Sequence, residues 1–462
     1  MQTREGRQVH ERTSNSQARV KPWGAGTKAD VWIANQNSER LMFDAELMEV
    51  ICERENLKAA LRRVVQNKGS PGIDGMSVDE LPGYLKAHWL EIKEQLLSGV
   101  YQPQPIKRTE VPKPGRRDKR KLGIPCVIDR FIQQAMLQVL QGEWDRTFSE
   151  HSYGFRPGRS AHQAVGAAQG HIKAGYGIVV DMDLEKFFDR IGHDRLMSTL
   201  AQRIADKRVL KLIRAYLQAG ILENGLISRP REGSVQGGPL SPFLSNVVLD
   251  ELDQELEARG HRFTRYADDC NIYVKSERAG QRVMASVSRF ITQRLKLKVN
   301  TEKSAVDKPQ NRTFLGFSFT AGKVPNRRKI ASASLQRFKA KVRSLTRRSS
   351  GISLEKRIAK LAVYLRGWRS YYGACETAAV LRDLDSWIRR RLRCVIWKQW
   401  KVYRQRKKEL MRRGVGEELA HSTAWSAKGP WAICHTPGVR IALNNQYFDA
   451  LALPRLAPQQ NI

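Results

Sequence analysis

The feature that most constrains the fold of this chain is a pair of adjacent acids, Asp268 and Asp269, between two short apolar segments. The flanking segments 263–266 and 270–274 predict a β-hairpin whose turn carries the pair. A third acid lies far upstream, at the end of the strand predicted over 178–182. Two acids on a turn, faced by one acid leaving a strand, can hold two Mg²⁺ ions about 3.5–4 Å apart over a reacting phosphate.

Two points about these acids stay open at this level. Asp is common in turns, so the pair on its own is also explained as a turn former. Asp181 and Asp183 are two residues apart and therefore lie on the same face of their strand. The sequence does not choose between them.

Charge is the second constraint. The 462 residues include 81 Lys and Arg but 46 Asp and Glu, a formal net charge of +35 with a pI near 10.3. Such an excess predicts a polyanionic partner. A membrane surface is the competing interpretation, and it is weakened because no apolar run approaches the roughly 20 residues of a spanning helix. The six cysteines are scattered without a C-x-x-C pair, which predicts neither disulfides nor structural zinc and fits a reducing cytosol.

The pattern along the chain predicts an α+β fold followed by a basic helical region. Residues 1–40 are polar and are expected to form a loose tail. Hydrophobic spacing predicts helices from about 41 to 65 and over 79–98, 127–147, 193–219 and 279–296, and strands on either side of the basic turn in 111–125 and over 178–182, 263–266, 270–274 and 313–319. Residues 323–413 carry 28 Lys and Arg against five acids, so most of the excess charge lies there.

Three further segments are candidates for ligand contact, and each has a structural alternative. Segment 234–243 contains Gly237-Gly238, which allows close backbone approach to a nucleotide, but it also suits an ordinary helix start. Segment 113–121 carries six cations in nine residues. These cations could bind the triphosphate of a nucleotide, or they could be the solvated end of a hairpin. Segment 152–160 mixes aromatic residues with Arg156 and Arg159. It could contact nucleic acid, or it could be an irregular connection between elements.

Basic runs in the helical region are normally solvated faces, but their density here favours phosphate contact. The aromatic residues Trp368, Tyr371 and Tyr372 are expected in a helix core rather than on a base-stacking surface. The residues expected to contact nucleic acid in this region are Arg389, Arg390, Arg391, Arg404, Arg406 and Lys407.

Taken together, the motifs resemble those of a bacterial group II intron reverse transcriptase, or maturase, over about residues 41–456. The resemblance rests on the order Gly-Ile-Asp-Gly, Leu-Gly-Ile-Pro, Ser-Tyr-Gly-Phe-Arg-Pro, Asp-Leu-Glu-Lys-Phe-Phe-Asp, Gln-Gly-Gly-Pro-Leu-Ser-Pro, Tyr-Ala-Asp-Asp and Phe-Leu-Gly-Phe. It implies a right-hand polymerase of fingers, palm with an antiparallel sheet, and helical thumb, followed by a small basic C-terminal domain. The expected parts are a tail over 1–40, an N-terminal extension and fingers over 41–110, fingers and palm over 111–325, a thumb and maturase domain over 326–400, and a DNA-binding-like region over 401–462.

The resemblance also implies roles for individual residues. It selects Asp183 over Asp181, because the first catalytic Asp of the family lies five residues before an aromatic residue, here Phe188. Asp183, Asp268 and Asp269 are then the catalytic acids, and Leu184 lends a backbone carbonyl to a metal ion. The residues expected at the nucleotide are Lys113, Arg120, Gln236 and Phe188, with the Phe188 ring excluding a 2′-hydroxyl.

The activity implied is RNA-directed DNA polymerisation with two Mg²⁺ ions, Mn²⁺ being a possible substitute, on an RNA template with a DNA primer and dNTPs. The other expected partners are group II intron RNA and target DNA, in a cytoplasmic, nucleoid-associated ribonucleoprotein. Two alternatives stay open: a mainly RNA-binding splicing cofactor, and a domesticated reverse transcriptase serving phage defence. The paired cysteines of the endonuclease found in many members are missing, so the resemblance is to the endonuclease-lacking, class C-like type.

Overall fold

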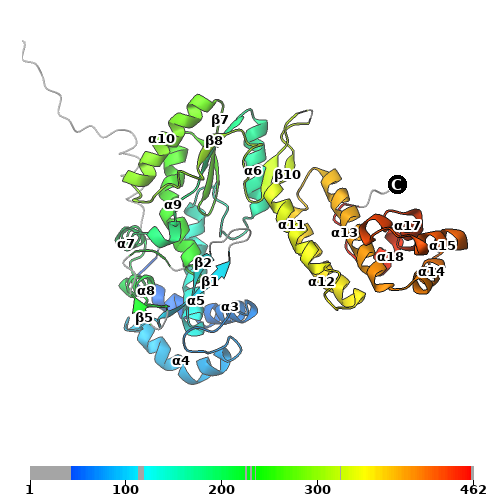
Figure 1. The fold of residues 1–462 in the computed structure, drawn as a ribbon. Coiled ribbons are helices and arrows are strands. Elements are labelled where there is room, and N and C mark those ends of the chain that lie inside the picture. Colours follow the sequence, from blue (N-terminus) through cyan, green and yellow to red (C-terminus); the bar gives the residue numbers. More distant parts are fainter. Residues whose placement is uncertain are drawn as a thin grey trace, which may run out of the picture.

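The computed structural model describes residues 43–112, 119–223, 226–228, 232–234, 236–322 and 324–458. The described chain forms two lobes (Figure 1): a mixed lobe up to about residue 322 and a helical lobe that follows it. The expected tail over 1–40 lies outside the described residues. Within the described part of the chain, every helix is too short or too polar to span a bilayer.

The centre of the mixed lobe is a four-stranded sheet in the order β6-β7-β3-β8, in which every neighbouring pair is antiparallel. Its strands are β3 (Ile178–Met182), β6 (Arg262–Tyr266), β7 (Asp269–Val274) and β8 (Ala305–Asp307). Alternate residues of β3 pack on opposite sides: Val179 joins the cluster that contains α6 (Ala161–Lys173), and Val180 joins the one that contains α10 (Glu277–Gln293). The sheet is therefore covered on both faces, with α10 and α6 on either side of it in Figure 1.

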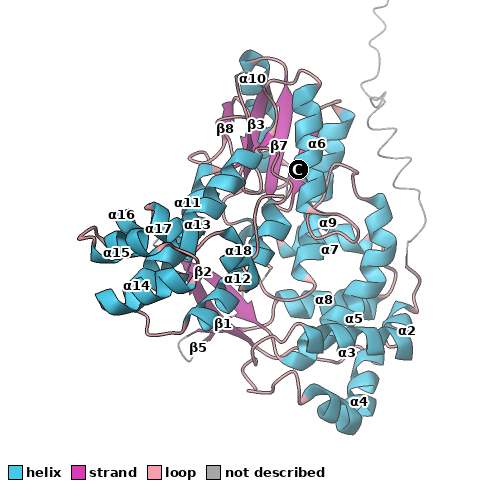
Figure 2. Ribbon diagram, turned by 90° about the vertical axis from the view of Figure 1, so that its right-hand side faces the viewer, coloured by secondary structure: helices cyan, strands magenta, loops and turns pink. Residues whose placement is uncertain are grey.

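A second sheet, in the order β2-β1-β4-β5, lies below the first (Figures 1 and 2). Its β1–β4 pair is parallel and the other pairs are antiparallel. The strands are β1 (Ile106–Pro112), β2 (Lys119–Ile124), β4 (Ile221–Glu223) and β5 (Leu226–Ser228). The remaining helices of this lobe are α2 (Leu47–Ile51), α3 (Arg54–Gln66), α4 (Leu81–Leu97), α5 (Val127–Trp144), η1 (Asp145–Thr147), η2 (Phe187–Arg190), α7 (His193–Ala201), α8 (Lys207–Leu217) and α9 (Ser241–Ala258).

A short hairpin of β9 (Phe317–Phe319) and β10 (Arg328–Ile330) leads into the helical lobe. That lobe consists of α11 (Ser332–Leu345), α12 (Leu354–Tyr372), α13 (Ala378–Gln399), α14 (Tyr403–Arg412), α15 (Glu417–Trp425), α16 (Pro430–Ile433), α17 (Pro437–Ala442) and α18 (Asn445–Ala450). The rings of Tyr371 and Tyr372 on α12 pack against Phe317, which fastens the lobe to the hairpin. Trp368 is buried, as expected, and Tyr371 and Tyr372 are half-buried and pack against the hydrophobic clusters.

Most predicted elements are present, with shifted ends. The helix expected from about 41 to 65 is divided into α2 and α3 around Glu53, and the one expected over 193–219 is divided into α7 and α8. The strand expected over 313–319 is confined to β9, because residues 315 and 316 have positive φ and turn the chain. Helix α6 is not among the predicted elements, and of α9 only the start at Ser241 is predicted. The buried face of α6 includes Ala and Gln, and that of α9 includes Ser, Asn and Asp, which weakens the hydrophobic period.

Candidate active site

The three acids singled out in the sequence meet at one end of the central sheet. Asp268 and Asp269 lie where β6 turns into β7, and Asp183 directly follows β3. Strands β3 and β7 are antiparallel, with Met182 paired with Cys270. One further step along this register sets Asp183 opposite Asp269. The sheet therefore brings together acids that are separated by more than eighty positions in the sequence.

The acidic turn is held from inside the protein by Arg265. This guanidinium is fully buried and binds the Asp253 carboxylate of α9 through two bonds of 2.7 and 2.5 Å. It also donates to the Ala267 carbonyl at 2.9 Å and to Asn246 Oδ1 at 3.1 Å. Ala267 has a φ of +57°, a left-handed conformation that is strained for a residue with a Cβ. Gly154 packs against the same turn, since a Cβ there would lie 2.3 Å from the Ala267 nitrogen.

Burial and mutual repulsion disfavour the ionised forms of these neighbouring carboxylates. Burial raises the pKa of Asp268, and Asp183 raises it further, whereas Arg120 lowers it. Burial raises the pKa of Asp269 to about 7, with smaller contributions from Asp268, Asp181 and Asp183. Like charges that raise each other's pKa are close in space, and a cation among them would be stabilised. The arrangement is one that binds positive charge.

Two cationic side chains that the sequence analysis missed neutralise the site. Lys303 Nζ lies 2.8 Å from Asp183 Oδ2, and Ser304 Oγ accepts a 3.0 Å bond from the Asp183 amide. Arg312 binds Asp181 Oδ2 at 2.6 Å. Asp181 and Asp183 thus have different partners, which the sequence could not reveal. In the sequence, Lys303 is only a basic residue in a polar segment. No neighbouring residue indicates that it binds Asp183, which is 120 positions away.

The residues present suit a divalent metal ion, although they do not form a ready-made cage. Within the described ranges, no group of three or more His, Cys, Asp or Glu side chains is gathered closely enough to hold a metal. The ammonium of Lys303 supplies a positive charge 2.8 Å from Asp183 Oδ2. Carboxylate oxygens are the preferred ligands of Mg²⁺. The donor set therefore fits, with Lys303 as a stand-in positive charge.

Of the residues predicted at the nucleotide, Gln236 lines a small cavity, whereas Arg120 and Phe188 are not among its lining residues. The loop that carries Gly237 and Gly238 is joined to β2, since Gly123 N donates to the Gln236 carbonyl at 2.8 Å. Ser234 N donates to the Phe188 carbonyl at 2.7 Å, which brings the aromatic residue to the same loop. A cavity of about 210 Å³ lies here; its lining includes Arg108, Lys121, Gly123, Asp189, Gly233 and Gln236. Lys113 lies outside the described residues.

Two of the arginines expected to contact nucleic acid have structural partners instead. Arg156 is buried and is bonded to Asp145 and to the carbonyls of Ser149 and Ser152. Arg156 was expected to contact nucleic acid, but its guanidinium is enclosed by residues of its own loop. Arg159 is half-buried above the Tyr153 ring, with the guanidinium 5.6 Å from the ring centre.

The six basic residues predicted in the helical lobe have several different environments. Arg389 is buried, contrary to the expectation of a nucleic-acid contact, because it lies on the inner face of α13. Arg390 stacks on the Trp431 ring at 3.7 Å, and Lys407 pairs with Glu417 at 2.7 Å. Arg404 is exposed. The remaining two, Arg391 and Arg406, line a cavity on the basic face.

Comparison with known proteins identifies the class. Residues 111–319 match the family described as reverse transcriptase (RNA-dependent DNA polymerase), and residues 335–414 match the group II intron, maturase-specific domain. The chain is 32% identical over 321 residues to Protein YkfC of Escherichia coli (strain K12), covering 60% of this chain and 83% of that protein. It is 34% identical over 195 residues to Group II intron-encoded protein LtrA of Lactococcus lactis subsp. cremoris, covering 42% of this chain and 32% of LtrA. It is 33% identical over 190 residues to Retron Mx65 reverse transcriptase of Myxococcus xanthus, covering 39% of this chain and 43% of that protein.

The chain belongs to the reverse transcriptase family and carries the maturase-specific domain of group II intron proteins. The predicted family, the right-hand polymerase fold and the enzyme class, an RNA-directed DNA polymerase, are confirmed. Family membership also implies divalent-metal dependence and nucleic-acid substrates in general terms. The chain spans most of YkfC but only about a third of LtrA.

Proposed function

We propose that this protein extends a DNA primer on an RNA template by two-metal nucleotidyl transfer. Asp183, Asp268 and Asp269 would hold two Mg²⁺ ions together with the carbonyl of Leu184, and Mn²⁺ could replace them. When bound, the metals activate the primer hydroxyl and neutralise charge on the leaving pyrophosphate. The observation that carries the proposal is the β3–β7 register, which sets Asp183 opposite the acidic turn.

The side chains around these acids would orient the incoming nucleotide. Arg120, which is near enough to lower the pKa of Asp268, would contact the triphosphate, and Lys113 is proposed for the same task from its position in the sequence. Gln236 would line the nucleotide site, and the Phe188 ring would lie beneath C2′ and exclude a hydroxyl there. Gln236 lines the cavity of about 210 Å³, which supports its place at the nucleotide.

The test is poly(rA)/oligo(dT) extension with Mg²⁺ by an Asp268→Asn variant. We expect at least a ~100-fold loss of rate, the scale seen when one preorganised electrostatic stabiliser is removed, with RNA binding retained. Asp307→Asn is the matched control, because Asp307 is on edge strand β8 of the same sheet and its carboxylate accepts from Lys308 N and Asn311 Nδ2. Near-normal extension by Asp268→Asn would remove the central assignment.

We further propose that the protein binds group II intron RNA and assists splicing and mobility into target DNA, as part of a nucleoid-associated ribonucleoprotein. The match over 335–414 and the excess of Lys and Arg over 323–413 support this role. We also propose the domain boundaries given above, which divide the chain into residues 41–110, 111–325, 326–400 and 401–462. Sequencing the DNA around the gene separates it from a domesticated enzyme, since an intron ribozyme should flank an intron-encoded protein.

A further inference from the structure

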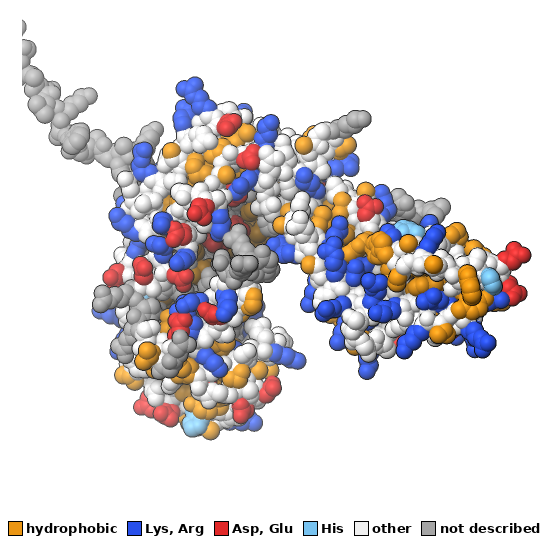
Figure 3. Space-filling view, viewed as in Figure 1, with side chains coloured by type: hydrophobic (Ala, Val, Ile, Leu, Met, Phe, Trp, Pro, Cys, Tyr) orange, Lys and Arg blue, Asp and Glu red, His pale blue; other side chains and the backbone are white. Residues whose placement is uncertain are grey.

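The helical lobe contains a cavity of about 610 Å³ with a strongly cationic lining. It lies where the loop after α11 meets α13, α14 and α16. Figure 3 shows Lys and Arg side chains gathered over this lobe, with acids at its far end. The cations that line the cavity are Arg347, Arg348, Arg391, Lys398, Lys401 and Arg406, and no acid is among the lining residues.

The charge of this cavity is not neutralised by the protein. Among the residues that the structure describes, none of these six cations forms an ion pair with an acid. Burial lowers the pKa of Arg391, and the nearby guanidiniums of Arg343 and Arg348 lower it further. Like charges held close together repel one another, and an anion placed among them would be stabilised.

Hydrogen bonds from a buried arginine hold one wall of the cavity in place. Arg357 on α12 is 2% exposed and donates to the carbonyls of Leu345 at 3.0 Å and Arg347 at 2.9 Å, and to Ser350 Oγ at 2.8 Å. These bonds of a buried cation hold the end of α11 and the backbone of the loop that carries Arg347 and Arg348. The loop is therefore held in place before any ligand arrives, which reduces the ordering cost of binding.

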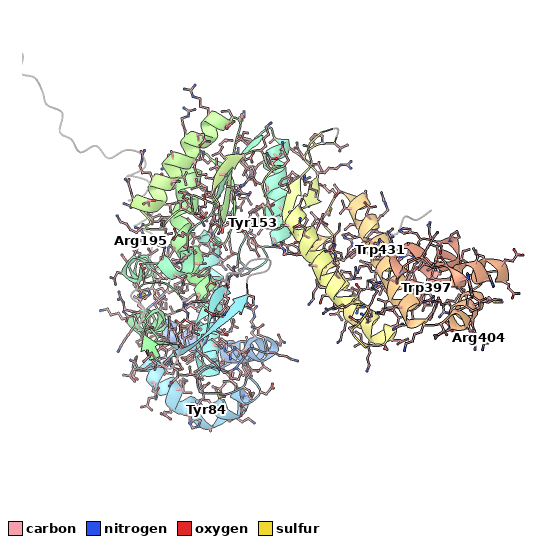
Figure 4. All side chains as sticks on the ribbon, in the orientation of Figure 1. Tyr84, Tyr153, Arg195, Trp397, Arg404 and Trp431 are labelled. Carbon is pink, nitrogen blue, oxygen red and sulfur yellow. The ribbon has the colours of Figure 1, made fainter. Side chains whose placement is uncertain are left out.

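Two of the lining cations are fixed in the same way. Arg391 Nε donates to Thr346 Oγ1 at 2.6 Å. Arg406 Nε donates to the Trp400 carbonyl at 2.9 Å, and its guanidinium lies 4.9 Å from the centre of the Trp397 ring. Their other nitrogen atoms keep donors for a ligand. Figure 4 labels both Trp397 and Arg404 on the helical lobe, and of the two only Trp397 lines the cavity.

We infer that this recess binds converging backbone phosphates of folded RNA. Six cations around one concavity match phosphates that approach each other, as in the loops and bulges through which RNA is recognised. A B-form duplex presents its phosphates in two evenly spaced rows, which suit a flat basic stripe better than a recess. The inference rests on the proposed RNA-binding role and assigns it to a defined site, most of it within the maturase-specific match.

The test variant is Arg348→Gln with Lys401→Gln. Both side chains are exposed, and no described residue forms a side-chain hydrogen bond or ion pair with either, so the fold does not depend on them. The matched control is Arg63→Gln with Lys86→Gln, one arginine and one lysine exposed on α3 and α4 of the other lobe. The two double variants make the same change in net charge and differ only in position.

The measurement is the salt dependence of binding of a fluorescent RNA hairpin with an internal loop, and of the DNA hairpin of the same sequence. Each phosphate contact contributes about −0.7 to −0.9 to the slope of log K against log salt, so we expect the test variant to lose about 1.5 from the RNA slope. The control variant should keep the wild-type slope. An unchanged RNA slope in the test variant, or an equal loss in the control, would overturn the inference. A loss confined to DNA would overturn the assignment to RNA.

Binding is measured in the Asp268→Asn background as well. If Asp268→Asn extends primers normally while the slope changes as expected, the catalytic proposal fails and the phosphate site stands. If Asp268→Asn is inactive but the slope does not change, the phosphate site fails and the catalytic proposal stands.

Discussion

Substituting Asp253 tests whether the buried pair beneath the acidic turn organises the active site. The carboxylate on α9 and the guanidinium of Arg265 on β6 both have no exposed side-chain surface. Burial raises the pKa of Asp253, and the charge of Arg265 opposes that increase. In Asp253→Asn the side chain keeps its shape and loses its charge, so the buried Arg265 loses its paired carboxylate.

The expected cost is large because only one partner is removed. Breaking a buried ion pair on one side typically lowers the free energy of unfolding by about 3–5 kcal/mol. Domains are commonly stable by only about 5–15 kcal/mol, so the effect should dominate a urea titration followed by circular dichroism. Primer extension should fall together with stability, because Arg265 also holds the Ala267 carbonyl.

A double variant separates stability from positioning. Replacing a buried pair by apolar residues of similar size is often neutral or stabilising, so Asp253→Leu with Arg265→Met should recover most of the stability. It should not recover primer extension, because the carbonyl of Ala267 and Oδ1 of Asn246 have still lost their donor. The reasoning is refuted if Asp253→Asn loses less than about 1 kcal/mol, or if the double variant extends primers at the wild-type rate.

Gly154→Ala should lower primer extension strongly, because its Cβ would lie 2.3 Å from the Ala267 nitrogen, whereas Gly166→Ala, whose Cβ meets nothing within 4 Å, should not. Phe188→Ala should admit ribonucleotides, and an unchanged ratio of dNTP to rNTP incorporation would contradict the role of the ring. Burial raises the pKa of Asp129 from 3.8 to about 7, so between those values the folded protein binds more protons than the unfolded chain and loses stability as pH rises. Asp129→Asn should flatten that slope in urea midpoints measured across the range, and a slope as steep as that of the wild type would refute the assignment.

The sequence by itself determined the class of the protein and much of its fold. The acidic turn between two short apolar segments predicted a hairpin, and strands β6 and β7 form it. Hairpins and amphipathic helices such as α8 and α10 can be recognised because their signals are local: a turn residue or a hydrophobic period. The order of the motifs then identified the family without any knowledge of the geometry.

The tertiary structure alone decided which side chains meet. Nothing near Lys303 in the sequence marks its bond to Asp183, and nothing near Arg156 shows that its own loop encloses it. The recess around Arg348 is formed by residues from four separate segments, so no single basic run predicts it. Burial and pairing depend on contacts between residues that are distant in the sequence, and the same arginine can serve the core or the surface. Composition therefore gave the charge of this protein, and only the packing of its helices and strands determined where that charge is available to a ligand.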